Sequence, residues 1–358
     1  MEILVIALVF GALAIAQSAL LGRLGLRGFS YERRFERRDA WVGDKVGFIE
    51  VIRNRGLLLL PWVRVETRVP PSFGFRTREA VDIRGENYHK SVFTLMPFSQ
   101  VTRRHQVTLH QRGHYTLQMA SVTAGDLLGM RNVGVDMEAP AEIFVYPALL
   151  GPEALSRLCS RAQGDVSVRR WIQPDPFLVN GIRGYRPGDP EHDIHWAATA
   201  RTGQLQVKTH DYTADPRLMV LINGQKTENQ WGDLMDYEQE AIERAISLAA
   251  TMCLQALRQG VEAGFGANMP LDEGEESAWL PPLPGRGREE ELLRAFARLR
   301  VKRVRRFPTF LEQLPPLRGV DYIILSCYDS EEIRQRMAAL RRMGCNAELV
   351  LLPEVPHA

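Results

Sequence analysis

Two histidines, His192 and His195, are residues of a type that binds transition metals, and they stand three positions apart. That spacing suits one helical turn, and His210 with Asp211 follows further along the chain. Pro190 makes a long helix here doubtful, and the spacing fixes no third ligand. A metal-dependent hydrolase that uses His192 and His195 therefore stays open, although packed or solvent-facing histidines are the simpler interpretation.

A turn-rich loop with many charges surrounds these histidines. Residues 181–189 read Gly-Ile-Arg-Gly-Tyr-Arg-Pro-Gly-Asp, and the Pro-Gly-Asp end predicts a turn. The fixed charges of this region are Arg183, Arg186, Asp189, Arg201 and Lys208. We expect Arg–carboxylate pairs to lock the loop as a structural latch while Tyr185 and Trp196 pack beneath it. A site for the acidic surface of a protein partner is the alternative.

Motifs for several other chemistries do not occur in the sequence. It contains no Gly-x-x-x-x-Gly-Lys or Gly-x-Gly-x-x-Gly phosphate loop and no Gly-x-Ser-x-Gly elbow. A net charge of +2 gives no global field for nucleic acid. The basic run 294–306 contains a single aromatic residue, Phe296, and no known nucleic-acid recognition module, which favours a solvated surface or contact with anionic lipid over nucleic acid. Four widely spaced cysteines indicate reduced thiols in a reducing compartment.

The elements that must position these residues begin with a C-terminal α/β domain, residues 216–358. Apolar runs at 217–222, 261–265, 320–326 and 347–352 predict strands, and helical periodicity at 236–259, 289–300 and 330–343 predicts helices between them. Asp236 and Asp329 are expected to cap two of these helices. Strands that alternate with helices predict a parallel, doubly wound sheet. The acidic stretch 269–287 is expected to be a surface loop.

An all-β domain is expected before it, over residues 23–147, and residues 148–215 connect the two. Alternating apolar and polar residues predict strands at 46–52, 62–69, 91–95, 101–109 and 115–122. Asn54-Arg55-Gly56 reads as a turn. Short strands at this spacing are typical of a β-sandwich.

The N-terminal segment, residues 1–22, is predicted to be a transmembrane anchor. Residues 3–22 carry no charge, and twenty helical residues span about 30 Å, the thickness of a hydrocarbon core. Six arginines follow within residues 23–38. The positive-inside rule therefore predicts a single-pass plasma-membrane protein with a cytoplasmic soluble part. A cleaved signal peptide and a buried core helix are the alternatives.

The loop resembles the signature of the bacterial domain-of-unknown-function family fifty-eight. That signature runs Arg-x-Tyr-x-x-Gly-Asp, Ile-His-Trp, Ala-Arg and Val-Lys. The matching residues here are Arg183, Tyr185, Gly188, Asp189, Ile194, His195, Trp196, Ala200, Arg201, Val207 and Lys208. Upstream, Arg112-Gly113-x-Tyr115 and Val145-Tyr146-Pro147 are similar to the membrane-proximal β segment of that family. The resemblance thus covers most of the chain.

The resemblance implies a membrane anchor, a β region and a domain similar to the von Willebrand factor A fold. It also implies a MoxR-type AAA+ ATPase as a partner, with no established enzymatic activity. Many relatives have two N-terminal spans, whereas this sequence shows one, so a second span upstream is the other interpretation.

The metal-binding motif of von Willebrand factor A domains is degenerate in this chain. Where such a domain carries Asp-x-Ser-x-Ser to bind Mg²⁺, this chain reads Asn223-Gly224-Gln225-Lys226-Thr227. We therefore expect no metal at Asn223, Gln225 and Thr227. Because ligands bind at the carboxyl ends of parallel strands, these three residues and Lys226 are instead candidate contacts for a protein partner.

These features together predict a membrane-anchored interaction or assembly protein without catalytic activity or cofactor, which works with a protein partner and does not bind nucleic acid. The metal-dependent hydrolase and an exported cell-wall-binding protein are the alternative functions.

Overall fold

The computed structural model describes residues 26–75, 80–83, 86–126, 131–151, 181–186, 191, 194–209, 217–230, 232, 234–315 and 317–352, with residues 11, 12, 15, 16, 18 and 19 before them. The chain divides into two compact units, Met1–Ala148 and Leu149–Ala358. Among the described residues, no helix is long and apolar enough to span a membrane. Most of the predicted anchor, residues 1–22, lies outside them.

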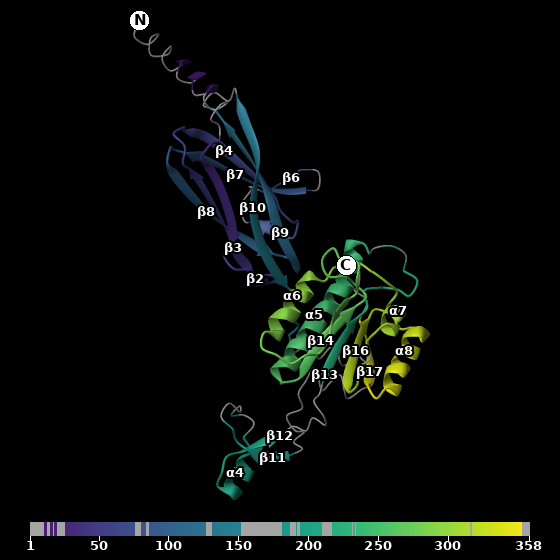
Figure 1. The fold of residues 1–358 in the computed structure, drawn as a ribbon. Coiled ribbons are helices and arrows are strands. Elements are labelled where there is room, and N and C mark those ends of the chain that lie inside the picture. The colour runs from purple at the N-terminus through teal and green to yellow at the C-terminus, as the bar shows by residue number, and fades with distance from the viewer. Residues whose placement is uncertain are drawn as a thin grey trace. The chain divides into compact units, whose positions relative to one another are not determined.

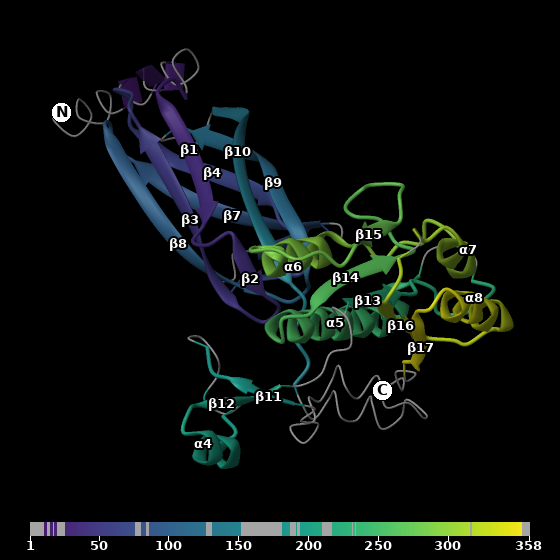
Figure 2. The same ribbon diagram turned by 60° about the horizontal axis from the view of Figure 1, so that its bottom comes forward.

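The first unit is a β-sandwich of two sheets (Figure 1). One sheet has the order β1 (Phe29–Phe35), β3 (Lys45–Asn54), β8 (Ser99–Leu109) and β5 (Phe73–Phe75). The other has the order β2 (Asp39–Trp41), β10 (Asn132–Tyr146), β9 (Gly113–Gly125), β4 (Leu60–Arg68), β7 (Glu86–Leu95) and β6 (Ala80–Ile83). Figure 2 shows β1, β3 and β8 side by side in one layer. The predicted β-sandwich is confirmed.

Alternation along the strands fills the space between the two sheets. In β3 the inward positions are Val46, Phe48, Glu50 and Ile52, and all four are buried. Such period-two patterning is what one covered face of an antiparallel sheet requires. Three of these four side chains are apolar. The fourth, Glu50, is charged, and a buried charge is stable only with partners.

The second unit contains a five-stranded sheet in the order β15 (Ala278–Leu280), β14 (Glu262–Ala267), β13 (Arg217–Ile222), β16 (Val320–Ser326) and β17 (Asn346–Leu351). All neighbours pair in parallel except β15, which is antiparallel to β14. Helices cover both faces: α5 (Asp236–Arg258), α6 (Arg288–Arg298), α7 (Phe307–Glu312) and α8 (Glu331–Arg342) (Figure 1). Side chains of α5 and α6 share one apolar core, and those of α7 and α8 share the other. The predicted α/β sheet is confirmed.

Local details of this unit differ from the expectations. Met235, not Asp236, is the N-cap of α5, and the backbone N–H of Met235 donates to Glu238 Oε2 at 3.1 Å. Ser330, not Asp329, caps α8, because its hydroxyl accepts from the Ile333 N–H. Both predicted caps were one residue out of place.

Residues 269–287 form more than the expected surface loop. Ala278 and Met269 are buried in the core, and β15 adds a short antiparallel edge to the sheet. Of the cysteines that the structure describes, Cys253 and Cys345 are buried free thiols and Cys327 is half-buried.

Candidate functional site

The signature residues that the structure describes form a small hairpin. Strands β11 (Gly181–Gly184) and β12 (Gln206–Thr209) pair antiparallel, with Arg183 opposite Val207. The short helix α4 (Trp196–Thr202) precedes β12. The backbone N–H of His195 donates to Gln206 O at 2.7 Å and so ties the start of this helix to β12. Residues of the signature that are up to 25 positions apart in the sequence thus lie together in this hairpin.

The two aromatic side chains of the signature are exposed. Trp196 is 68% exposed and Tyr185 is 37% exposed, so the expectation that they pack beneath the loop is wrong. Arg201 is exposed as well, and Arg183 donates to Gly184 O at 3.1 Å. Exposed Trp, Tyr and Arg side chains are the types that contribute most to protein–protein binding.

The carboxylate of the predicted latch, Asp189, lies outside the described residues together with Gly188 and His192. The backbone of Lys208 belongs to β12, whereas its side chain is also outside them. The latch and the metal-dependent hydrolase therefore stay predictions.

His195 has a local structural role. Its Nδ1 accepts a hydrogen bond from the Ala198 N–H at 3.1 Å and caps the first turn of α4. A ring nitrogen thus replaces the side-chain oxygen that usually caps a helix. This contact occupies one of the two ring nitrogens of His195, so only Nε2 is left to bind a metal in the hydrolase hypothesis.

The carboxyl edge of the parallel sheet is closed by neutral side chains. Asn223 follows β13, Asn268 follows β14, and Ser326 ends β16; all three are fully buried. The Asn223 amide donates to Ser326 Oγ at 2.9 Å, and the Gly224 N–H donates to Asn268 Oδ1 at 2.7 Å. Hydrogen bonds among these groups pin the ends of three neighbouring strands together.

Gln225 completes this network and is also fully buried. Its Oε1 accepts from the Phe307 N–H at 2.7 Å, while its own N–H donates to Asn223 Oδ1 at 3.0 Å. The expectation that Asn223 and Gln225 contact a partner is therefore wrong. Thr227 is exposed and Lys226 is half-buried, so both stay candidate contacts.

The donor set at this edge does not fit Mg²⁺. A hard divalent cation prefers carboxylate oxygens, and Asn223, Gln225, Asn268 and Ser326 supply only amide and hydroxyl groups. These groups already make hydrogen bonds; Asn268 Nδ2, for example, donates to Arg305 O at 3.0 Å.

The neighbouring thiol of Cys327 is not an activated nucleophile. Burial raises the pKa of Cys327 to about 11, and nearby Lys226 only partly opposes this rise. The thiol is therefore neutral at pH 7, whereas the thiolate is the reactive form.

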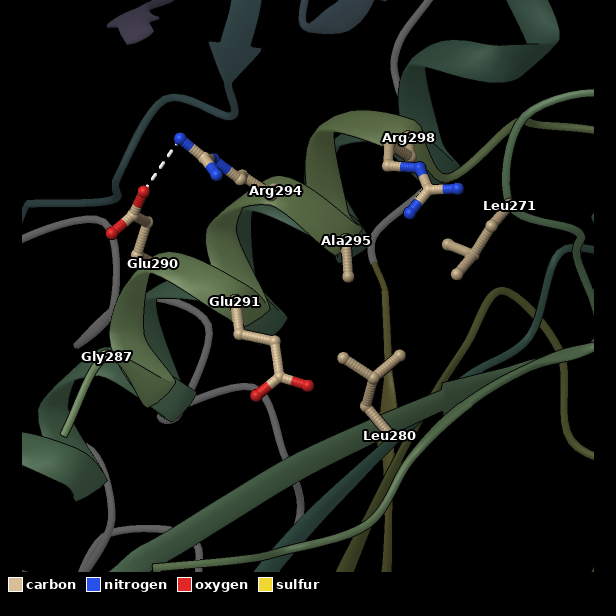
Figure 3. A pocket seen from close by; sticks show the side chains of 8 residues that line it. All are labelled: Leu271, Leu280, Gly287, Glu290, Glu291, Arg294, Ala295 and Arg298. Atoms are coloured by element: carbon tan, nitrogen blue, oxygen red, sulfur yellow. Dashed lines mark ion pairs between the residues drawn. The ribbon is translucent and has the colours of Figure 1, made fainter. Parts of the chain in front are cut away.

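A hollow of about 500 Å³ lies beside α6, where the basic run begins. Figure 3 shows Leu271, Leu280 and Ala295 at this hollow, with charged side chains around them. Arg294 pairs with Glu290 at 2.7 Å, and Arg298 pairs with Asp272 at 2.6 Å. Since these charges already have partners on the same surface, the hollow resembles a solvated surface more than a site prepared for an anion.

A polar cluster that was not predicted from the sequence is buried between the two sheets of the sandwich. Glu50 of β3 is fully buried. Its Oε1 accepts from Tyr31 at 2.7 Å, and its Oε2 accepts from Ser91 at 2.8 Å. His105 Nε2 lies 2.9 Å from the same Oε2, and His89 Nε2 lies 3.6 Å from it.

These partners keep Glu50 ionised. Burial alone would raise the pKa of this carboxyl, but the hydrogen bond from His105, the adjacent His89 and the hydrogen bond from Tyr31 outweigh it and hold the pKa well below its usual range. Burial and the adjacent Glu50 raise the pKa of Tyr31, so the phenol stays protonated and donates.

Arg33 of β1 supplies the balancing charge. Its side chain is 5% exposed and crosses to the opposite sheet, where Nε donates to Ala139 O at 2.6 Å. Its two remaining nitrogens donate to Thr67 Oγ1 at 2.7 Å and to Met119 O at 3.1 Å. The cluster therefore contains one ionised acid and one guanidinium, each with hydrogen-bond partners.

Glu50, His89 and His105 place one ligand atom each within 4.8 Å of one another, a spacing that a metal ion could bridge. A metal on His89 Nε2 would leave Nδ1 as a protonated donor, and Nδ1 is buried without a partner among the described residues. It would also displace hydrogen bonds of Glu50 and add two positive charges near Arg33. The cluster fits a structural network that joins the two sheets better than it fits a metal site.

A protein-family model matches the hairpin and three strands of the sheet, β13, β14 and β15. Residues 181–319 match the family model "Protein of unknown function DUF58". No curated protein matches the chain.

Solved structures give weaker likenesses. A non-cellulosomal cohesin from Archaeoglobus fulgidus is 9% identical over 32% of this chain and 91% of its own, with a TM-score of 0.24. A CARDB domain from Pyrococcus furiosus is 15% identical over 33% of this chain and 93% of its own, with a TM-score of 0.22.

The family match begins at β11 and continues through the arginine-rich hairpin into the sheet whose edge is closed by Asn223 and Gln225. The resemblance noted in the sequence is thereby confirmed for this part of the chain. Residues 181–319, less than half of the chain, are thus similar to the DUF58 family of proteins of unknown function.

Proposed function

We propose that this chain is a membrane-anchored, non-catalytic protein whose DUF58 hairpin binds an acidic surface of another protein. The observation that carries the proposal is the exposure of Trp196 and Tyr185 on one small hairpin. Large aromatic side chains are normally covered in a folded unit, and exposed ones gather at binding surfaces.

Charge favours an acidic partner. Arg186 and Arg201 lie exposed on the same hairpin as the two aromatic residues, and guanidinium groups bind carboxylates in a bidentate manner. The resemblance described above makes a MoxR-type AAA+ ATPase the partner to test first. The uncharged run 3–22 and the arginines after it support the anchor and a cytoplasmic soluble part, where a cytosolic ATPase is within reach.

The α/β unit supports a binding function without chemistry. We propose that it is a von Willebrand factor A-like domain whose metal position has become a neutral network around Asn223 and Gln225. In such a domain the edge of the sheet stays rigid without a cation, and Lys226 and Thr227 remain available at the surface.

The test is a Trp196→Ala variant of the full-length chain, with Met343→Ala as its control. Met343 is 46% exposed and follows α8, so it matches Trp196 as a large exposed apolar residue outside the hairpin. Binding of the purified ATPase to the membrane-reconstituted chain is measured by titration. Trp196→Ala is expected to weaken binding at least tenfold, which corresponds to about 1.4 kcal/mol.

The melting temperature separates this function from a structural latch. Weakened binding at an unchanged melting temperature supports the proposal. A lower melting temperature for Trp196→Ala, but not for Met343→Ala, would show that Trp196 stabilises the fold. Reporter fusions at the C-terminus, one active only in the cytosol and one only outside, test the membrane topology separately.

A further inference from the structure

One end of the sandwich exposes three large apolar side chains on two adjacent turns. Leu57, in the turn between β3 and β4, is 81% exposed. Met96 and Phe98, in the turn between β7 and β8, are 62% and 70% exposed. These three side chains, together with the exposed Arg27 and Arg55, are called the apolar tip.

The two turns are fixed to each other. Asn54 is 3% exposed, and its Nδ2 donates to Leu58 O at 2.8 Å and to Met96 O at 3.1 Å. Its Oδ1 accepts from the Gly56 N–H at 3.0 Å. Leu57 and Met96 therefore belong to one rigid surface, although they are 39 residues apart in the sequence.

The backbone at Phe98 is held in a conformation that rarely suits this residue. Its φ is +54°, in the left-handed region where glycine or asparagine is usual and a bulky side chain is rare. A phenylalanine at a strained, exposed turn adds nothing to the core. Strain of this kind more often has a functional reason than a structural one.

The chain reaches the apolar tip directly from the predicted anchor. The Arg55 N–H donates to Gly28 O at 2.8 Å, so residues 26–28 lie against the turn that carries Leu57. Leu26 is four positions after Gly22, the last residue of the uncharged run, and an extended chain covers at most about 14 Å over those four steps. This side of the sandwich is therefore tethered at the depth of the lipid headgroups.

Charges beside the apolar side chains suit an anionic membrane surface. Arg27 and Arg55 are both exposed, and they flank the point where the chain joins the sandwich. A cation near a bilayer is attracted to anionic headgroups, while Leu and Phe side chains gain free energy by leaving water.

We propose that the apolar tip, Leu57, Met96 and Phe98 with Arg27 and Arg55, inserts into the headgroup layer of the membrane that holds the anchor, with anionic lipid as its ligand. The inference rests on the membrane anchor of the proposed function. It adds that the sandwich itself binds lipid, so that side chains of the first unit, and not the anchor alone, hold it against the bilayer.

The test places a tryptophan at the apolar tip of the full-length chain. Phe98→Trp keeps an aromatic side chain, and Gln111→Trp is the matched control. Gln111 is exposed in the turn after β8, and the eleven residues of that strand put it about 35 Å from Phe98. Both variants are reconstituted into vesicles of phosphatidylglycerol and brominated phosphatidylcholine, whose bromine atoms quench nearby tryptophan. The signal of the six native tryptophans is subtracted with the parent chain.

The expected result is at least threefold stronger quenching for Phe98→Trp than for Gln111→Trp. Equal quenching in a chain that floats with the vesicles would overturn the insertion of the tip and leave the anchor intact. A chain that does not float with vesicles would overturn both. A tryptophan at position 98 that is shielded from bromine and from aqueous acrylamide alike would indicate a protein occupant and also overturn the proposal. Should Phe98→Trp lower the melting temperature, Leu57→Trp on the adjoining turn takes its place.

Discussion

Replacement of Glu50 by alanine removes the shared acceptor of the polar cluster between the two sheets. Tyr31, Ser91 and His105 would each lose the hydrogen bond to Glu50, and the Arg33 guanidinium would lose its balancing charge. The perturbation thus affects both sheets of the sandwich, since Ser91 lies in β7 and the other partners lie in β1 and β8.

The magnitude follows from these contacts. An unsatisfied buried donor costs about 1–3 kcal/mol, and removing one partner of a buried charged pair costs about 3–5 kcal/mol. Since solvent and side-chain movement relieve part of the first cost, we expect Glu50→Ala to lower the free energy of unfolding of the sandwich by about 4 kcal/mol. For a unit of 148 residues this corresponds to a melting temperature about 10 °C lower.

The assay is denaturant unfolding of the detergent-solubilised chain, followed by hydrogen exchange in peptides of β3, because the two units can unfold separately. Glu32→Ala is the control: Glu32 lies on the neighbouring strand, 62% exposed, in an ion pair with Arg53. It should change the unfolding free energy by less than about 0.5 kcal/mol. A change below about 1 kcal/mol for Glu50→Ala would show that the network is solvated, and the structural role given to it would be wrong.

Further tests concern pH, the closed sheet edge and the strained turn. The pKa of Glu50 is lower in the folded state than its unfolded value of about 4.3. The ionised Glu50 therefore adds its full share to the free energy of unfolding above that pH, and this share is lost as the pH falls below it. Between pH 7 and pH 2 the unfolding midpoint should fall more steeply for the parent chain than for Glu50→Gln. Asn223→Asp places a carboxylate at a fully buried position and should lower the free energy of unfolding by about 2–3 kcal/mol. Millimolar Mg²⁺ should restore part of this free energy. An unchanged melting temperature would contradict the closed hydrogen-bond network at the sheet edge. Phe98→Gly removes the strain of a positive φ and should raise the free energy of unfolding in detergent by about 0.5–1 kcal/mol, whereas a loss of more than 1 kcal/mol would show that Phe98 stabilises the fold.

Strongly periodic segments could be predicted from the sequence. The alternation at 46–52, 62–69 and 101–109 corresponds to β3, β4 and β8, and the helical run 236–259 corresponds to α5. In each case one face of the element is covered, so the period of the apolar residues follows the element directly.

Irregular elements could not be predicted in this way. β10 is largely exposed at its start and contains Pro140, and its pairing with β9 shifts register between Glu138 and Ala141. The bulge breaks the alternation on which the prediction depends. α7 has only six residues and a proline in its first turn, which is too short for helical periodicity to appear.

The polar cluster had a signal that the pattern alone could not interpret. Period two puts Glu50 on the same face as Phe48 and Ile52, so its burial could be predicted. Its partners Ser91 and His105 are 41 and 55 residues away, and only the folded sandwich brings them together. The exposure of Trp196 likewise depends on tertiary contacts and not on the local sequence.

The hydrogen bond from Arg33 to β10 affects when the sandwich can fold during synthesis of the chain. Its acceptor on β10, the Ala139 carbonyl, lies 106 residues further along the chain. At a translation rate of about 5–20 residues per second, that carbonyl is made roughly 5–20 s after Arg33. Throughout this interval the first strand carries a guanidinium without its acceptor, so the sandwich closes only after β10 is complete. The N-terminal segment has by then long left the ribosome, so insertion of the proposed anchor would precede folding of the sandwich.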